Sequence, residues 1–62
     1  MPPWVIRRQS DVYVRGKTEK LGTVTETDTG RWLAIPVKGL RAICTSQNEA
    51  ARWLWQKREE DR

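Results

Sequence analysis

The side chains with the clearest chemical potential in this sequence are its basic residues, and the chemistry they favour is the binding of phosphate. Residues 1–44 hold eight lysines and arginines against four acidic residues, whereas residues 45–62 hold four of each. The net charge of +4 therefore belongs to the first segment. Ammonium and guanidinium groups neutralise phosphates, and arginine can also bond guanine through two hydrogen bonds. The pattern favours a polyanionic partner; the alternative is an ordinary solvated surface with a mild basic excess.

Catalytic and metal-binding chemistry has few candidate residues. The chain has no histidine and a single cysteine, Cys44, so Ser-His-Asp and Cys-His systems, Cys/His zinc sites and an intramolecular disulfide are excluded. Cys44 is expected to be a small buried residue at a strand end. The acidic run Glu59-Glu60-Asp61 offers no converging set of metal ligands. We therefore expect no enzyme activity, no catalytic residues, no metal, no cofactor and no small-molecule substrate.

The apolar stretches are too short for a membrane span, which needs about 20 residues. At the N-terminus the arginines follow a very short apolar patch, the reverse of the order in a secretory signal. We expect a reducing, cytoplasmic setting without a membrane partner.

The length and turn signals predict the elements that position these groups. A chain of 62 residues has room for one domain. Residues 1–11 are predicted to be an N-terminal arm, because Pro2 and Pro3 discourage regular structure. The apolar Trp4-Val5-Ile6 within it should dock on the domain or form a short edge strand. Residues 12–62 form the domain, in which alternation predicts strands at 12–15, 21–26, 31–37 and 40–44.

The hydrophobic period then changes to that of a helix. Ser46 and Glu49 have the spacing of a capping box, with Thr45 as the alternative cap. Ala50, Trp53, Leu54 and Lys57 recur on one helical face, which predicts a helix over 47–59 followed by fraying in Glu60-Asp61-Arg62. The expected fold is α+β, a three- or four-stranded antiparallel sheet packed on one C-terminal helix.

Alternation in the third strand assigns its two faces. Leu33, Ile35 and Val37, together with Ile43, are expected to face Leu54 of the helix, which leaves Trp32, Ala34 and Pro36 on the open face. This assignment puts Arg41 on the inner side, so it requires a bulge or a strand end at that residue.

Residues 21–57 resemble the N-terminal arm-binding domain of phage and transposon tyrosine recombinases. The resemblance lies in Gly30-Arg31-Trp32-Leu33-Ala34, the turn at Gly39, and the run Ser46 to Leu54 with its Glu-Ala-x-x-Trp-Leu core. That family is similar in fold to the plant ethylene-response-factor DNA-binding domain, three antiparallel strands on one helix. The resemblance implies that the sheet face opposite the helix enters the major groove. Cys44 stands where the family usually has an aromatic residue, and the recombinase catalytic domain is missing.

The leading hypothesis is therefore a small regulatory protein of a phage or mobile element, accessory to recombination or transcription, that reads duplex DNA through its open sheet face. Arg31 and Arg41 would contact base edges, and Arg15, Lys17, Lys20 and Lys38 would contact phosphates. The arm would reach a minor groove or be a solvated edge strand. The predicted DNA-binding residues are Arg7, Arg8, Arg15, Lys17, Lys20, Arg31, Trp32, Lys38 and Arg41.

The tryptophans support a second hypothesis. Trp53 is expected in the core. Trp32 would either stack on bases or be buried under Trp4 or the arm. Should Trp4, Trp32 and Trp55 be exposed, the chain would instead be a protein-interaction module, because tryptophan is enriched where proteins bind each other.

Overall fold

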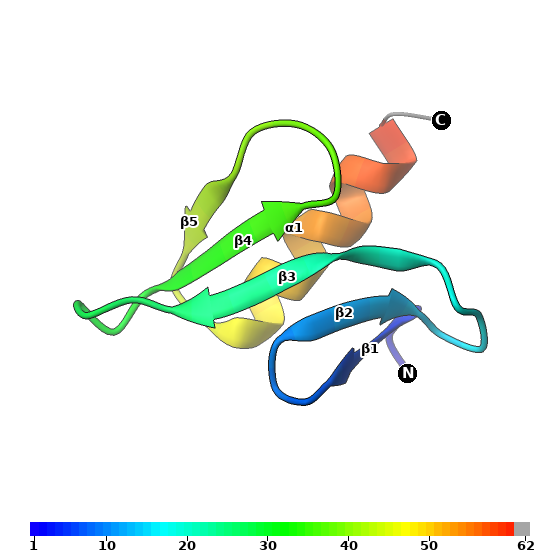
Figure 1. The fold of residues 1–62 in the computed structure, drawn as a ribbon, viewed down its shortest axis with the longest axis horizontal. Helices are drawn as coiled ribbons and strands as arrows, with labels where there is room; N and C mark the ends of the chain where they lie inside the picture. Colours follow the sequence, from blue (N-terminus) through cyan, green and yellow to red (C-terminus); the bar gives the residue numbers. More distant parts are fainter. Residues whose placement is uncertain (61–62) are drawn as a thin grey trace.

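The five strands follow one another as an antiparallel meander, with each strand hydrogen-bonded to its neighbour in sequence (Figure 1). The computed structural model describes residues 1–60. Its elements are β1 (Trp4–Arg7), β2 (Asp11–Val14), β3 (Lys20–Glu26), β4 (Trp32–Pro36), β5 (Ala42–Cys44) and α1 (Gln47–Glu60). The predicted α+β class, an antiparallel sheet on one C-terminal helix, is confirmed, although the sheet has five strands where three or four were expected.

The additional strand comes from the segment predicted as an arm. β1 pairs along its whole length with β2, from Trp4 opposite Val14 to Arg7 opposite Asp11. Trp4 and Ile6 alternate toward the core, so their apolar surface is covered only when this segment joins the sheet. Of the two alternatives for the apolar residues of the arm, the structure shows the edge strand.

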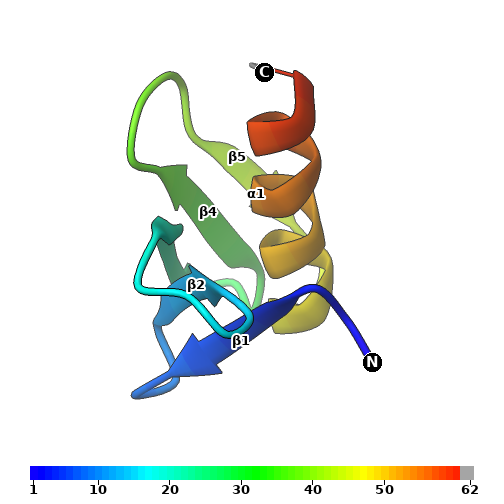
Figure 2. The same ribbon diagram turned by 90° about the vertical axis from the view of Figure 1, so that its right-hand side faces the viewer.

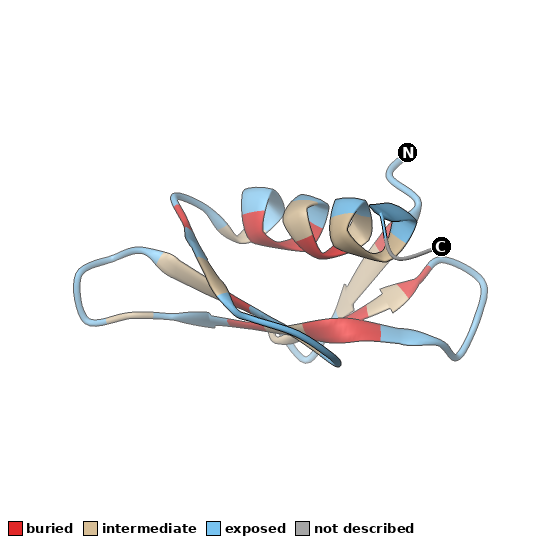
Figure 3. Ribbon diagram, turned by 90° about the horizontal axis from the view of Figure 1, so that it is seen from above, coloured by how far each residue is buried: buried red, intermediate tan, exposed pale blue. Residues whose placement is uncertain are grey.

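The helix lies along one face of the sheet, and the sheet curls around it (Figure 2). As a result α1 contacts the edge strand β1 as well as β3, β4 and β5. Figure 3 shows the buried residues on the facing sides of the two layers. The buried core consists of Trp4, Val12, Val14, Leu21, Val24, Ala34, Cys44, Ala50, Ala51 and Leu54.

The predicted orientation of β4 is wrong. Ala34 is fully buried beneath the helix, whereas Ile35 is 37% exposed and Ile43 of β5 is 65% exposed. The reason is the close approach of the two layers, which several small inward residues permit. Ala34 and Ala42 are paired on the sheet, and Ala50 and Ala51 are buried on the helix. Both alternating sets of β4 are apolar, so hydrophobicity alone could not decide which set faces inward.

The helix begins where the sequence predicted, at Gln47. The Ser46 hydroxyl accepts a hydrogen bond from the Glu49 N–H at 3.1 Å, while the Glu49 carboxylate accepts one from the Thr45 hydroxyl. Ser46 is therefore the cap, and Thr45 binds the Glu49 carboxylate instead of capping a backbone N–H. Glu60 is the last helical residue rather than part of a frayed end, and Asp61 and Arg62 lie outside the described residues. Within the described residues, no helix has the length and apolar character needed to cross a membrane.

Candidate interaction surface

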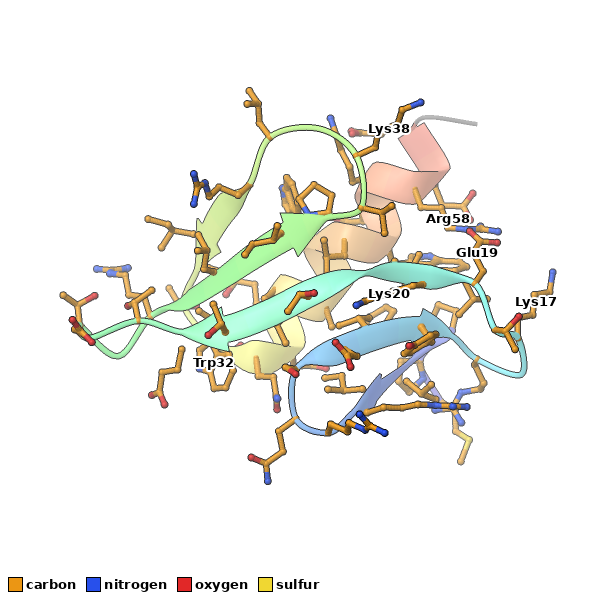
Figure 4. The ribbon with its side chains drawn as sticks, viewed as in Figure 1. Lys17, Glu19, Lys20, Trp32, Lys38 and Arg58 are labelled. Carbon is orange, nitrogen blue, oxygen red and sulfur yellow. The ribbon has the colours of Figure 1, made fainter. Side chains whose placement is uncertain are left out.

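No described residue covers the sheet face turned away from α1, and this face has two chemically different halves (Figure 4). On β4 and β5 this face carries Leu33, Ile35 and Ile43, which alternate with the inward Ala34 and Ala42. Strand pairing places on the other half of the same face the residues Val5, Arg7, Asp11, Tyr13, Lys20, Thr23 and Thr25. The surface therefore changes from charged and polar to aliphatic across β3.

The aliphatic patch is defined here as Leu33, Ile35 and Ile43. Leu33 lies directly opposite Ile43 in the ladder, and Ile35 lies two residues further along β4. The loop between β4 and β5 carries two further exposed aliphatic side chains, Val37 and Leu40, which are 68% and 86% exposed. Contiguous exposed aliphatic side chains next to polar residues are typical of surfaces that bind another molecule.

Two of the predicted DNA-binding residues lie on the open face, and both are engaged within the chain. The Arg7 guanidinium stacks over the Tyr13 ring, 5.1 Å from its centroid. The Lys20 ammonium pairs with the Asp11 carboxylate at 3.3 Å. A third residue, Arg15, donates from Nε to the Pro2 carbonyl at 2.7 Å, which ties its side chain to the N-terminal segment.

The other predicted basic residues border the sheet rather than cover it. Arg8 lies in the turn between β1 and β2, and Lys17 in the turn between β2 and β3. Arg31, Lys38 and Arg41 are exposed at the entry to β4 and in the loop between β4 and β5, close in sequence to the aliphatic patch. The structure thus places cations at the ends of the strands and does not gather the predicted set into one continuous basic face.

The tryptophans do not form the exposed surface considered from the sequence. Trp4 is buried at 9% exposure, and Trp32, Trp53 and Trp55 pack half-buried against the core. Trp32 lies on the helix side of β4, where it shares a shallow cleft with Gln47 at the start of α1. The assignment of Trp32 to the open face was therefore wrong, for the same reason as the orientation of β4.

Sequence reasoning missed a charged cluster on the helix. Arg58 donates from Nε and Nη2 to the two carboxylate oxygens of Glu19, at 2.6 and 3.2 Å, and its guanidinium stacks on Trp55. The hydrogen bond to Glu19 is the main cause that raises the pKa of Arg58. The sequence held one signal for this cluster. The helical periodicity placed Lys57, the neighbour of Arg58, on the helix face that packs against the sheet.

Cys44 occupies the buried strand-end position expected for it. Burial raises the pKa of the thiol, and the nearby Glu49 carboxylate raises it further. A raised pKa leaves less thiolate at a given pH, so this cysteine is a poor nucleophile.

We expect the rate of Cys44 alkylation by iodoacetamide to rise with pH along a curve whose midpoint lies above that of the same chain unfolded in urea. The reason is that the folded thiol ionises at higher pH. A midpoint below that of the unfolded chain would contradict the burial of this thiol.

Among residues 1–60, the acidic and cysteine side chains form no group of three that could hold a metal ion. Comparison of the chain with family models, curated proteins and solved structures gave no match. The resemblance to recombinase arm-binding domains accordingly stays a prediction from the sequence.

Proposed function

We propose that this chain is a protein-interaction module that docks another protein on its aliphatic patch. The observation that carries the proposal is the inverted amphipathicity of β4 and β5. These strands turn leucine and isoleucine toward the open face and alanine toward the core. Ile43 is 65% exposed, Ile35 is 37% exposed and Leu33 is half-buried, while Ala34 is fully buried. Folding gains little from the outward side chains, because hydrophobic stabilisation follows the apolar area removed from water. Docking of a partner would remove that area.

The residues around the patch indicate the chemistry of the partner. Arg31, Lys38 and Arg41 are exposed and lie close to it in sequence, and none of the three forms an ion pair with a described residue. A partner surface with an aliphatic centre and an acidic rim complements this arrangement. A second copy of the chain would bring the same cations together, which opposes self-association through this face.

The test is site-specific photocrosslinking in the cells that encode the chain. A benzoylphenylalanine at position 43 should crosslink one protein, whereas the same group at Arg52, exposed on the helix, should not. The purified partner should then bind the chain, and Ile43→Thr should weaken that binding about ten-fold or more, as expected for loss of a central apolar contact. Ile43→Thr keeps a β-branched side chain, so the strand is retained.

Equal crosslinking from positions 43 and 52, or binding that Ile43→Thr leaves unchanged, would overturn the docking surface. Concentration-dependent dimerisation abolished by Ile43→Thr would overturn the assignment of a foreign partner and favour a second copy.

Duplex DNA is the second candidate, favoured by two observations. The open face is not covered by any described residue, and the excess of basic residues belongs to the segment that forms the sheet. In such a complex Arg31 and Arg41 would approach base edges, Thr25 and Ile43 could contact thymine methyl groups, and Lys17 would meet phosphates. The phage or mobile-element setting rests on the resemblance alone. A titration with random-sequence duplex decides between the candidates. Binding whose affinity falls steeply with salt concentration would favour DNA as the partner.

A further inference from the structure

A second surface feature lies at the end of the sheet where β3 and β4 separate. Gly22 pairs with Pro36, and the Val37 N–H still donates to the Leu21 carbonyl at 3.3 Å, but beyond this point the two strands lead into different loops. The resulting cleft has a volume of about 480 Å³. Its lining comes from both strands and from the C-terminal half of α1: Glu19, Lys20, Leu21, Pro36, Val37, Lys38, Leu54, Lys57 and Arg58.

The walls of the cleft include hydrocarbon. Leu21 and Leu54 are buried core residues whose side chains reach this wall, and Pro36 and Val37 add apolar surface from the end of β4. Five of the nine lining residues are charged, so the cleft joins an apolar wall to a charged one. Its volume of several hundred cubic ångströms lies in the range of small-ligand sites.

Two of the cations that line the cleft have a carboxylate partner, and two do not. Lys20 is paired with Asp11 and Arg58 with Glu19, so these two carry their own counter-charges. Lys38 and Lys57 form no ion pair with any residue in the described part of the chain. Figure 4 shows Lys38 on the loop between β4 and β5, and Arg58 and Glu19 beside one another below it.

Both unpaired lysines line the cleft. A β-carbon built on Gly39 would lie 3.7 Å from Cε of Lys57, so the stem of Lys57 reaches the loop next to Lys38. Two like charges held at one cleft repel each other, and an anion bound between them would relieve that repulsion. An ammonium group acts as a point charge and suits a single carboxylate, whereas Arg58 is already occupied by the Glu19 carboxylate in two-point contact.

We propose that this cleft binds an aliphatic carboxylate. Its hydrocarbon part lies on Pro36 and Val37, against the wall to which the buried Leu21 and Leu54 contribute, and its carboxylate lies between the ammonium groups of Lys38 and Lys57. Two sources carry this chemistry: a free fatty acid, or the C-terminal leucine or valine of another polypeptide. The cleft contains none of the three residues of the aliphatic patch, although Lys38 is used in both proposals. Binding in the cleft therefore does not depend on the proposed function.

The experiment is an NMR titration of the full chain, at low salt, with four probes. Octanoate is the free acid, and an acetylated pentapeptide ending in leucine with a free carboxylate is the peptide source. Octanol and the amidated pentapeptide are their uncharged counterparts. We expect octanoate or the free pentapeptide to shift the methyl signals of Leu21 and Leu54 and the backbone amides of Lys38 and Lys57. Whichever of the two binds identifies the source.

The variants separate the cleft from other surfaces. Lys38→Gln and Lys57→Gln should each weaken binding about five-fold, the effect of one partly exposed charge contact. Arg52→Gln, on the exposed side of the same helix, should leave binding unchanged, and so should Ile43→Thr on the open face. Circular dichroism melts establish that each variant is folded.

Three results would overturn the proposal. Octanol or the amide could bind as well as the acid, which would show that the lysines contribute nothing. Inorganic phosphate could produce the same shifts at the same concentration, which would leave an unspecific anion site. No shift at the cleft with either acid at millimolar concentration would exclude the site.

Discussion

Replacement of Leu54 by alanine is expected to lower the free energy of unfolding by about 3 kcal/mol, the usual cost of deleting a fully buried leucine side chain. Leu54 is 1% exposed and is the largest fully buried side chain in the described structure. It lies on the helix and meets the sheet over Gly22. Because a domain of this size buries a modest core, such a loss removes a large part of its total stability. Urea denaturation followed by tryptophan fluorescence measures the change.

The matched substitution on the opposite face is Ile43→Thr. This change also removes hydrocarbon, but from a side chain that is 65% exposed, so the expected loss is within about 0.5 kcal/mol. The contrast between the two variants tests the orientation of the sheet directly. A loss at Ile43 as large as the loss at Leu54 would mean that Ile43 belongs to a core, and it would remove the basis of the aliphatic patch.

The arrangement of elements was predictable because each depends on local chemistry. β2 to β5 follow the predicted segments with shifts of a few residues at their ends, and Pro36 lies at the end of β4, as a residue without an N–H should. The helix start was set by Ser46 and Thr45, both of which contact Glu49. Interactions between residues three or four apart leave a pattern in the sequence that needs no knowledge of the fold.

The orientation of β4 depends on non-local packing and was not predictable in this way. Its two sets, Leu33 with Ile35 and Trp32 with Ala34, are both apolar, and the choice between them is made by the helix that covers the sheet. One clue was present: the predicted orientation required a bulge or a strand end at Arg41. In the structure β5 begins at Ala42, so the strand ends next to Arg41, which is exposed.

The candidate site was predicted in part for the same reason. The sequence located the excess of basic residues in the sheet segment, but their distribution around its border depends on where each strand ends. The aliphatic patch was missed because its residues were assigned to the core. Lys57 shows the limit of periodicity: a lysine on the buried stripe was noticed, yet only the fold shows that its stem reaches the loop at Gly39.

The close packing of sheet and helix, which puts small residues on the inner face of β4, also leaves no room for larger side chains at some positions. Gly22 lies in β3 between Val12 and Pro36. A β-carbon there would clash with the Ile35 carbonyl oxygen and lie 3.0 Å from both Leu54 Cδ2 and Pro36 Cα. Two of these atoms are backbone of β4 and cannot rotate away, so the strand itself would have to move.

Gly22→Ala is therefore expected to lower the free energy of unfolding by about 3 kcal/mol, at the upper end of the cost of overpacking a core. Gly30→Ala is the matched control. A β-carbon at Gly30 meets no atom within 4 Å, but its φ of 79° disfavours alanine, and the expected loss is about 1 kcal/mol from backbone conformation alone. Urea denaturation of both variants separates the two causes, since only Gly22→Ala adds a steric conflict to the exchange of glycine for alanine. A smaller loss at Gly22 than at Gly30 would show that β4 and the helix do not approach β3 as closely as the structure has them. The close approach of the layers could then no longer explain why Ala34 faces the helix and Ile35 faces water.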